Sequence, residues 1–586
     1  MAPTGRIRTW REHPLRDSAC RLAALLLATS VFVSSGCLVP AQARDNDPDP
    51  AQSADASGSH HDRDGHRSDR RPDLKATESL TDGSVTIGGA RVDYQAAAGT
   101  LVVHPKGWDD TASLMHGQAT GSDHDDDKGD DGKAGKDAEA SMFYVAYFKK
   151  GARAENRPIT FLYNGGPGSS SVWLHMGAFG PRRVITANDS HTDAAPYSLV
   201  DNDESLLDST DLVFIDAPGT GFSRIAGPDK EKSFYGIDQD GHAFSKFIAA
   251  FLSKYGRWNS PKYLFGESYG TTRSAVLAND LENDEEIDLN GVILLSQILN
   301  FDASIDQPGF NPGVDLPYVV ALPTFAATAW YHHKLPAGTS TELKPLLAEV
   351  QHFATTDYLE ALAQGAALDP AAREHIAERL HAYTGLPVDY LKKSDLRVDG
   401  GQFEKMLQDD TGTTTGRLDS RFSGPSMDPL SKEADYDPQS ASIGSAYVSV
   451  FNDYVRRTLK YGQDHYYKPD VAEIGKAWDM QHQPPGADDK QQSSANVMPD
   501  LATAMKYNPK LKIQLNAGYF DLATPYYEGV YEMQHLPIPA SLQGNIEFRQ
   551  YESGHMVYAN QAALKQLHDN VADFIRRTDN QHATSP

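Results

Sequence analysis

Residues 263–270 read Tyr-Leu-Phe-Gly-Glu-Ser-Tyr-Gly, and small or apolar residues then recur at helical spacing: Ser274, Val276, Leu277 and Leu281. A Gly-x-Ser-x-Gly run between a strand and a helix is typical of a nucleophile elbow, a sharp turn that lifts a serine hydroxyl above a sheet. Such a turn needs small flanking residues, which accounts for Gly266 and Gly270. A glycine-bearing turn without chemistry is the alternative that these residues leave open.

Apolar runs on both sides of this stretch predict strands that alternate with helices, which indicates an α/β sheet. The predicted strands are 85–87, 90–94, 99–103, 141–148, 159–163, 212–216, 292–295, 511–516 and 546–551. Helical spacing marks 244–252 and 564–575. We expect an α/β-hydrolase fold: a mixed, mostly parallel sheet flanked by helices, with an inserted helical cap over the strand ends.

The chain divides into five predicted segments. They are a signal peptide (1–43), a disordered linker (44–80), a first part of the hydrolase core (81–300) with a disordered insertion (108–139), a helical cap (301–505) and a second part of the core (506–586). The linker has almost no large apolar side chain to offset the entropy of ordering it. The insertion is expected to interrupt a β-hairpin.

The first residues predict export. An arginine-rich start precedes the apolar run Leu22–Val33, and Ala41-Gln42-Ala43 fits a cleavage site. Cys37 follows Ser34-Ser35-Gly36, so a lipid anchor at Cys37 is the alternative route. The exported chain is expected to be periplasmic or secreted. Since Cys20 and Cys37 are the two cysteines of the chain, the mature body has no disulfide.

The formal net charge of -26 argues against a nucleic-acid partner, because phosphate recognition needs basic faces. Two polar tracts could bind metal, but we interpret both as solvated surface. His60, His61 and His66 lie in the linker, and the acidic run 123–131 lacks the glycine and the closing glutamate of a calcium loop. We predict no metal and no cofactor.

A serine nucleophile needs a base, and the base needs an orienting acid; in this fold class they follow in the order Ser, Asp or Glu, His. Asp521 follows the strand 511–516, and His555 follows the strand 546–551. An oxyanion hole needs two N–H donors, which we expect from Tyr269 and from the glycine-rich loop 164–168.

The chain resembles the serine carboxypeptidase family, in its exported bacterial branch, over roughly residues 85–103 and 141–577. The motifs that carry the resemblance are Asn164-Gly165-Gly166-Pro167-Gly168-Ser169-Ser170, Asp216-Ala217-Pro218-Gly219-Thr220-Gly221-Phe222-Ser223, Gly266-Glu267-Ser268-Tyr269-Gly270 and Gly554-His555-Met556-Val557. The resemblance implies Ser268 as nucleophile, His555 as base, Asp521 as its orienter, and Gly166 and Tyr269 as oxyanion donors. It also implies that the substrate's C-terminal carboxylate meets Asn164, Gly165 and Glu267, and we add Met556 to this predicted substrate-binding set.

Glu267 can donate to a carboxylate only while protonated, and burial near another negative charge raises a carboxyl pKa. We therefore expect peptidase activity to be favoured at acidic pH. Two departures from the family pattern concern the same region: Leu162 stands where the family has tryptophan, and Ala178 stands where it has a second glutamate. The second departure weakens the expected specificity for free C-termini but leaves the hydrolytic residues intact.

The sequence thus predicts a serine-type carboxypeptidase that acts on peptides through an acyl-enzyme. An esterase or acyltransferase with the same three residues is the alternative, and a non-catalytic binding protein on a hydrolase scaffold is a third. Side-chain preference and oligomeric state stay open.

Overall fold

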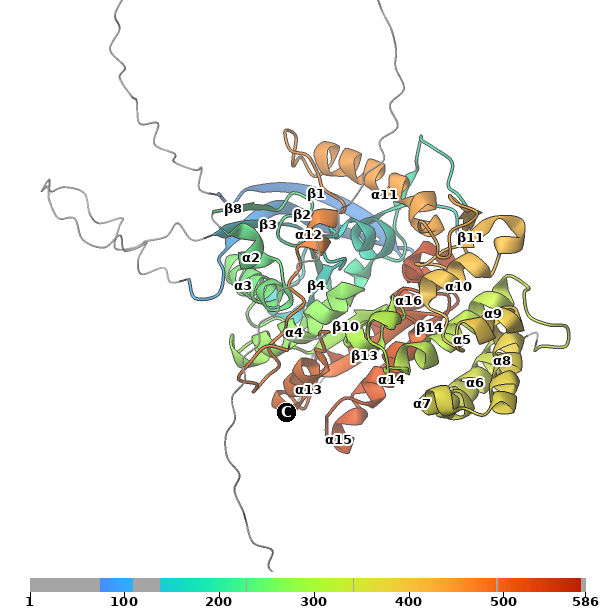
Figure 1. Ribbon diagram of the computed structural model, residues 1–586. Coiled ribbons are helices and arrows are strands. Elements are labelled where there is room, and N and C mark those ends of the chain that lie inside the picture. Colours follow the sequence, from blue (N-terminus) through green and yellow to red (C-terminus); the bar gives the residue numbers. More distant parts are fainter. Residues whose placement is uncertain (1–73, 109–137, 228, 341, 492–493, 581–586) are drawn as a thin grey trace, which may run out of the picture. The chain divides into compact units, whose positions relative to one another are not determined.

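A ten-stranded sheet forms the centre of the computed structural model, which describes residues 74–108, 138–227, 229–340, 342–491 and 494–580. In Figure 1 the sheet runs from the blue strands β1 and β2 to the orange and red strands β13 and β14. In order across the sheet, the strands are β1 (Glu78–Ile87), β2 (Ala90–Val103), β3 (Glu139–Lys149), β7 (Asp211–Ile215), β4 (Ile159–Tyr163), β9 (Lys262–Glu267), β10 (Gly291–Leu295), β13 (Lys512–Gly518) and β14 (Ile546–Tyr551), and β8 (Arg224–Ala226) pairs with β3.

The pairing is antiparallel from β1 to β7 and parallel from β7 to β14. Every residue of β4, β9 and β10 is buried, as expected for parallel strands covered on both faces. The mixed, mostly parallel sheet predicted from the sequence is confirmed. β4 lies between β7 and β9, so the chain runs from β4 to β7 on one side and later to β9 on the other. Such a reversal of direction opens a crevice at the carboxyl ends of β4 and β9.

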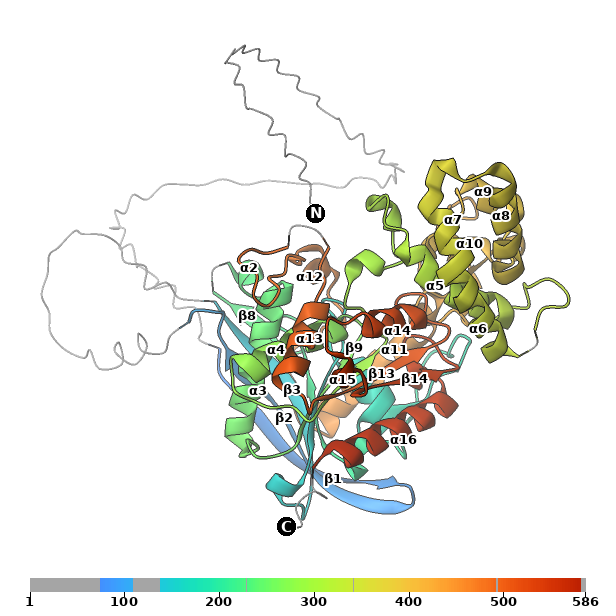
Figure 2. The same cartoon turned by 90° about the horizontal axis from the view of Figure 1, so that it is seen from below.

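Alternate side chains of the central strands enter two hydrophobic cores, one on each face of the sheet. Leu162, Phe265 and Ile293 belong to one core, whereas Phe161 and Leu264 belong to the other. The first core includes side chains of α11 (Pro438–Arg457) and α16 (Gln561–Thr578). The second includes α3 (Ile237–Tyr255), α4 (Tyr269–Asn283) and α13 (Met498–Tyr507). Figure 2 shows α16 on one side of the sheet and α3 and α4 on the other.

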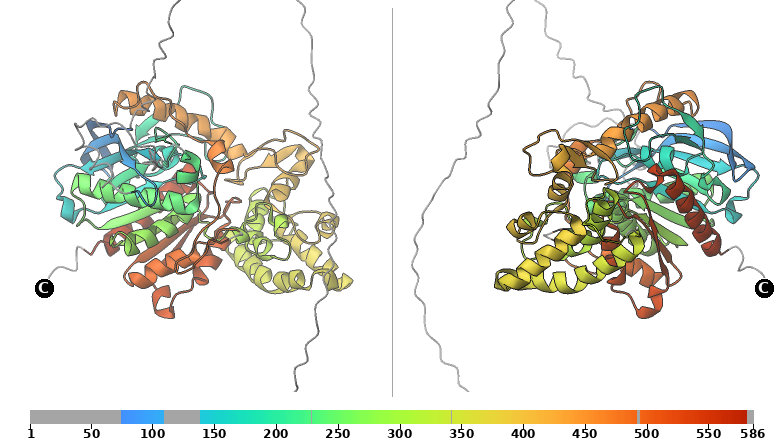
Figure 3. Two further views of the ribbon diagram at one scale, coloured as in Figure 1. Left: turned by 60° about the vertical axis from the view of Figure 1, so that its left-hand side comes forward. Right: turned by 90° about the vertical axis from the view of Figure 1, so that its right-hand side faces the viewer.

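The long segment between β10 and β13 carries a helical bundle with a core of its own. Its helices are α5 (Leu316–Tyr331), α6 (Leu343–Phe353), α7 (Leu359–Gln364), α8 (Pro370–Thr384), α9 (Val388–Lys393) and α10 (Gly400–Met406). Figure 3 shows these yellow helices gathered together. The segment also holds α11 and α13, whose side chains enter the cores of the sheet instead. The cap limits 301–505 stay a prediction, and within them only α5–α10 form a separate bundle.

The remaining elements are short. They are β5 (Arg182–Val184) paired with β6 (Leu199–Asp201), β11 (Thr413–Thr415) paired with β12 (Ser423–Pro425), and the helices α2 (Lys230–Phe234), α12 (Ala472–Lys476), α14 (Tyr526–Gln534) and α15 (Ala540–Gln543). Among the described helices, none combines the length and the apolar character that a membrane span requires.

Several predictions of the sequence lie outside the described residues: the signal peptide 1–43 with Cys37, the linker up to residue 73, and the insertion over 109–137. Two limits are corrected. β1 begins at Glu78, inside the predicted linker, because Glu78 pairs with Gly99. β3 begins at Glu139, inside the predicted insertion, because its first residues pair with β8. The strands β2 and β3 on either side of the insertion pair antiparallel, which confirms the predicted hairpin.

A buried imidazole ties the segment after α12 to two helices of the core. His482 Nδ1 lies 2.6 Å from Asp238 Oδ1 on α3, and Nε2 lies 2.8 Å from Asp500 Oδ2 on α13. Burial alone would lower the pKa of His482, but the two carboxylates outweigh it and raise the pKa to about 9. The protonated ring is therefore the form that the fold stabilises.

We expect His482→Gln to lower the apparent melting temperature by about 5 °C near neutral pH, because each carboxylate loses a charged partner. A histidine whose folded pKa is raised contributes stability that is complete below its unfolded pKa and is lost as pH rises through the folded value. The difference between wild type and variant should thus shrink between about pH 6.5 and pH 9. Thermal unfolding followed by circular dichroism at several pH values measures this difference, with the exposed His375→Gln on α8 as control. A difference in melting temperature that does not change with pH would contradict a protonated His482 in the folded state.

Candidate active site

The predicted nucleophile lies on a strained turn between a strand and a helix. β9 ends at Glu267, α4 begins at Tyr269, and Ser268 between them has φ 60° and ψ −133°. A Cβ atom on Gly266 would lie 2.1 Å from the carbonyl oxygen of Gly270, and one on Gly270 would lie 2.9 Å from that of Tyr163. The turn therefore requires both glycines, which is the reason the sequence has them.

Asp521 and His555 meet at the ends of neighbouring strands. Asp521 follows β13, His555 follows β14, and His555 Nδ1 lies 2.8 Å from Asp521 Oδ2. The carboxylate is fully buried and accepts three further hydrogen bonds: from Ala523 N (2.9 Å), Thr524 N (3.0 Å) and Thr524 Oγ1 (2.7 Å). These bonds hold the carboxylate rigidly against the imidazole.

One cavity of about 500 Å³ gathers most of the predicted site residues. Its walls include Asn164, Gly165, Gly166, Glu267, Ser268, His555 and Met556. A second cavity of about 300 Å³ shares Ser268 and Gly166 with the first, and Tyr269, Ala523 and Thr524 also line it. Ser268 thus lies where the two cavities meet. Asp521 lines neither cavity and reaches them through His555.

The glycine-rich loop after β4 packs directly on the first turn of α4. A Cβ atom on Gly165 would lie 2.5 Å from the backbone nitrogen of Tyr269, so this approach requires glycine. Within the described residues, no hydrogen bond uses the N–H of Gly166 or that of Tyr269. Both groups are therefore available to an oxygen atom bound beside Ser268.

Glu267 is buried at the end of β9 with a tyrosine as its closest partner. The Tyr558 hydroxyl lies 3.1 Å from Oε1 and 2.9 Å from Oε2, and Asn164 also contacts the carboxyl group. Burial raises the pKa of Glu267 to about 7, against the opposing effects of His555, Tyr558 and Asn164. Glu267 therefore holds its proton through most of the acidic range.

The pKa of His555 is set by two opposing effects. Burial would lower it, but the charge of Asp521, the hydrogen bond to Asp521 and the charge of Glu267 raise it above its ordinary value. When Glu267 takes up a proton, one of these negative charges disappears and the pKa of His555 falls. A protonated Glu267 and a neutral His555 can therefore coexist.

Sequence reasoning missed the segment 416–422, which hydrogen-bonds to the loops that carry Asp521 and His555. His555 N donates to Leu418 O (2.6 Å), Gly554 N to Asp419 Oδ2 (3.1 Å) and Leu522 N to Arg417 O (3.0 Å). The Arg417 side chain lines both cavities and pairs with Asp306. The sequence placed this segment within the predicted cap, 301–505, and no local pattern distinguishes it.

Tyr558 is the second residue that sequence reasoning missed. The buried helical turn Leu174–Phe179, which carries Ala178, packs against Tyr558 and Tyr447, since a Cβ atom on Gly177 would lie 2.7 Å from both rings. A hydroxyl rather than a second carboxyl group is thus the partner of Glu267. The run His555-Met556-Val557-Tyr558 could have suggested that Tyr558 belongs to the site, because it places Tyr558 in the same short loop as the predicted base His555.

The sheet is mostly parallel, a serine elbow follows β9, and an acid and a histidine follow β13 and β14. These features together define an α/β-hydrolase. Comparison with known proteins narrows this class. The sequence model described as "Serine carboxypeptidase" matches residues 132–356, which contain the glycine-rich loop and the elbow. Over this stretch the chain is similar to the serine carboxypeptidase family.

Two curated relatives align with part of the chain. A serine carboxypeptidase-like protein of Oryza sativa subsp. japonica is 31% identical over 134 residues, or 22% of this chain and 28% of that protein. A pheromone-processing carboxypeptidase KEX1 of Phytophthora infestans is 27% identical over 216 residues, or 34% of this chain and 32% of that protein. The chain thus spans about a third or less of the length of these relatives.

Among solved structures, the prohormone-processing carboxypeptidase KEX1 of Saccharomyces cerevisiae superposes on this chain with a TM-score of 0.47 and 15% identity. That superposition covers 82% of this chain and 91% of the yeast chain.

Proposed function

We propose that this chain is a serine carboxypeptidase that releases C-terminal residues from peptides. The observation that carries the proposal is the shared cavity. It brings Ser268, the His555 imidazole paired with Asp521, and a buried Glu267 carboxyl group to one place. A nucleophile with its base and a neutral acid that can bind a carboxylate thus line the same cavity.

In the proposed reaction, Ser268 Oγ attacks the last peptide carbonyl carbon while His555 Nε2 takes the hydroxyl proton. The N–H groups of Gly166 and Tyr269 donate to the oxyanion. The imidazolium then gives its proton to the leaving amino group, which frees the C-terminal residue and leaves an ester on Ser268. Water, deprotonated by His555, hydrolyses this ester and regenerates the serine. Asp521 keeps Nδ1 as a donor throughout.

The leaving residue occupies the larger cavity, because Asn164, Gly165 and Glu267 line that cavity and would contact its carboxylate. Met556 lines the same cavity and would contact its side chain. The acyl side of the substrate then occupies the smaller cavity, which Ser268 also lines. No step of this scheme needs a metal or a cofactor.

A digest of a peptide library, with free and amidated C-termini, tests the proposal by mass spectrometry. We expect ladders of products shortened by single residues from the free C-terminus, and little cleavage of amidated peptides. Equal cleavage of both forms would contradict the exopeptidase reaction. It would favour the alternative of an esterase or acyltransferase, which the lack of a second carboxyl group beside Glu267 supports.

The pH dependence of substrate binding should follow Glu267. Because its pKa is about 7, the acid donates to a substrate carboxylate below pH 7 and repels it above. We expect the KM for a free-acid peptide to rise about tenfold between pH 6 and pH 8. In Glu267→Gln the amide donates at every pH, so this rise should disappear. Initial-rate kinetics measures KM at each pH, with the exposed Glu360→Gln as control. The same rise of KM in Glu267→Gln would refute the binding of the substrate carboxylate by Glu267.

For its location, we propose export, supported by the arginine-rich start, the apolar run Leu22–Val33 and the cleavage motif 41–43. The mature chain would be periplasmic or secreted, with a lipid anchor at Cys37 as the alternative. N-terminal sequencing and lipid labelling of the mature protein distinguish the two routes.

A further inference from the structure

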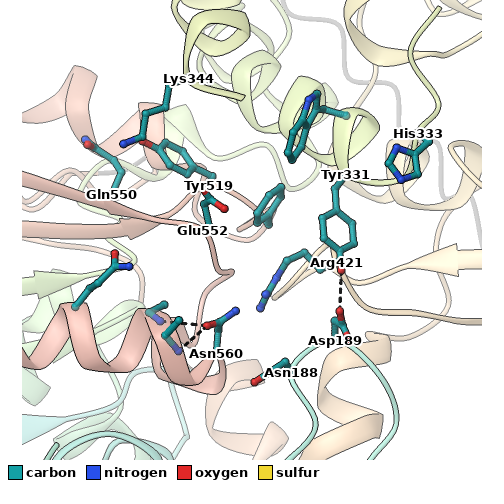
Figure 4. Close-up of a pocket in the computed structure, with 15 residues that line it drawn as sticks. Asn188, Asp189, Tyr331, His333, Lys344, Arg421, Tyr519, Gln550, Glu552 and Asn560 are labelled. Atoms are coloured by element: carbon teal, nitrogen blue, oxygen red, sulfur yellow. Dashed lines mark hydrogen bonds between the residues drawn. The ribbon is translucent and has the colours of Figure 1, made fainter. Parts of the chain in front are cut away.

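A large cavity lies outside the proposed active site. Its volume is about 860 Å³, and it shares no residue with the two cavities that Ser268 lines. Its walls come from the end of α5 and the start of α6, from the loops after β13 and β14, and from the start of α16. Figure 4 shows polar and aromatic side chains converging on it from all these elements.

Four aromatic side chains line this cavity: Trp330 and Tyr331 at the end of α5, and Tyr519 and Phe520 after β13. The rings of Tyr331 and Phe520 contact each other, with centroids 5.4 Å apart at 61°. The Tyr331 hydroxyl donates to Asp189 Oδ2 (2.9 Å), which joins α5 to the loop after β5. The aromatic residues thus form apolar faces beside the polar groups of the cavity.

Planar polar groups occupy the rest of the wall. Asn560 Oδ1 accepts from Ala562 N (2.9 Å) and Ala563 N (3.1 Å), so its orientation is set and its amide nitrogen faces the cavity (Figure 4). Asn188, Gln550, Gln566 and Glu552 supply further amide and carboxylate groups. Each of these groups presents two heteroatoms that can hydrogen-bond neighbouring hydroxyls.

The charges of the cavity balance. Asp189 and Glu552 oppose Lys344 and Arg421. Arg421 is buried and bound by Asp419 through Nε (2.9 Å) and Nη2, and within the described residues no hydrogen bond uses its Nη1. A ligand therefore finds a fixed donor here without a net positive charge, and an anion would meet two carboxylates among the lining residues.

From these observations we propose that this cavity binds a neutral saccharide. A pyranose ring has an apolar C–H face that matches an aromatic side chain, and vicinal hydroxyls that match planar amide, carboxylate and guanidinium groups. A lipid chain would leave the amides unpaired, which is costly. An aromatic wall with a few fixed polar groups is also the usual composition of a small-molecule site.

The cavity adjoins the back of both loops that carry the predicted acid and base. Phe520 directly precedes Asp521, and Arg421 holds Asp419, whose Oδ2 accepts from Gly554 N beside His555. A saccharide in this cavity would therefore contact the outer surface of these loops while Ser268 stays accessible. The site and its test do not depend on the proposed peptidase activity.

Titration calorimetry on full-length Ser268→Ala, which removes turnover, tests the proposal. Two probes, N,N′,N″-triacetylchitotriose and maltotriose, distinguish an amino-sugar from a hexose ligand. We expect one of them to bind with a Kd below about 1 mM. Trp330→Ala and Glu552→Ala should each weaken binding at least about fivefold. Trp258→Ala, which removes an exposed tryptophan outside the cavity, should leave it unchanged.

Glu552 is exposed, so its variant keeps the test decisive if Trp330→Ala fails to fold. Three results would overturn the proposal: no heat from either saccharide at about 10 mM, binding that both cavity variants leave intact, or binding that a peptide substrate abolishes by competition. A peptide that binds this cavity in place of both saccharides would overturn it as well.

Discussion

Replacing Ser268 with alanine is expected to reduce kcat/KM for a free-acid peptide by roughly 10⁵-fold or more, to the level of binding and oxyanion stabilisation alone. Without the Ser268 hydroxyl, a water molecule must attack the substrate carbonyl instead. It would have to do so from the position of that hydroxyl, where the two cavities meet. In the proposed reaction, the strained backbone of Ser268 presents that hydroxyl to the substrate.

Single-turnover peptide hydrolysis measures the loss, and a fluorophosphonate probe reports the nucleophile directly. The probe should label wild type and leave Ser268→Ala unlabelled. Ser541→Ala makes the same chemical change on the exposed helix α15 and should keep full activity. Residual activity above about a hundredth of wild type, or a probe adduct at another serine, would rule out Ser268 as the nucleophile.

Replacing Asp521 with asparagine is expected to lower kcat by about 10⁴-fold with little change in the fold. The hydrogen bonds predict which way the new amide faces. Oδ1 of Asp521 accepts from the backbone N–H groups of Ala523 and Thr524, so the oxygen of asparagine must stay on that side. Its NH₂ group then replaces Oδ2 and points at His555 Nδ1.

Facing a donor, His555 Nδ1 must act as an acceptor, and the ring proton moves to Nε2. The nitrogen that should take the serine proton is then already protonated, so attack is blocked while the geometry is kept. Asp357→Asn, an exposed position in the helical bundle, is the matched control. Pre-steady-state kinetics separates acylation from substrate binding, and a loss smaller than about tenfold would contradict the role of Asp521.

The positions of the strands along the chain and the elbow could be predicted because both depend on local patterns. Apolar runs of strand length bounded by turn residues mark β4, β9, β10 and β13, and the steric limits of one turn require Gly266 and Gly270. The rule that parallel strands present their carboxyl ends at one edge then suggested that Asp521 and His555 face each other, and they lie 2.8 Å apart.

The contacts that no pattern could predict join residues far apart in the chain. The Tyr558 hydroxyl donates to Glu267, and the segment 416–422 hydrogen-bonds to both loops of the predicted acid and base. Helix α11 is amphipathic, yet it packs on the sheet rather than in the bundle α5–α10. Amphipathicity shows that a helix has a buried face but not what covers that face.

The sequence by itself therefore determined the class of fold, the strained serine turn and the identity of the candidate acid and base, since steric limits and periodicity act between near neighbours. Tertiary structure alone decided the partner of Glu267, how far the pKa of that carboxyl group is raised (to about 7) and the existence of the 860 Å³ cavity. Each of these depends on burial and on distances between distant segments, and such quantities exist only once the chain has packed.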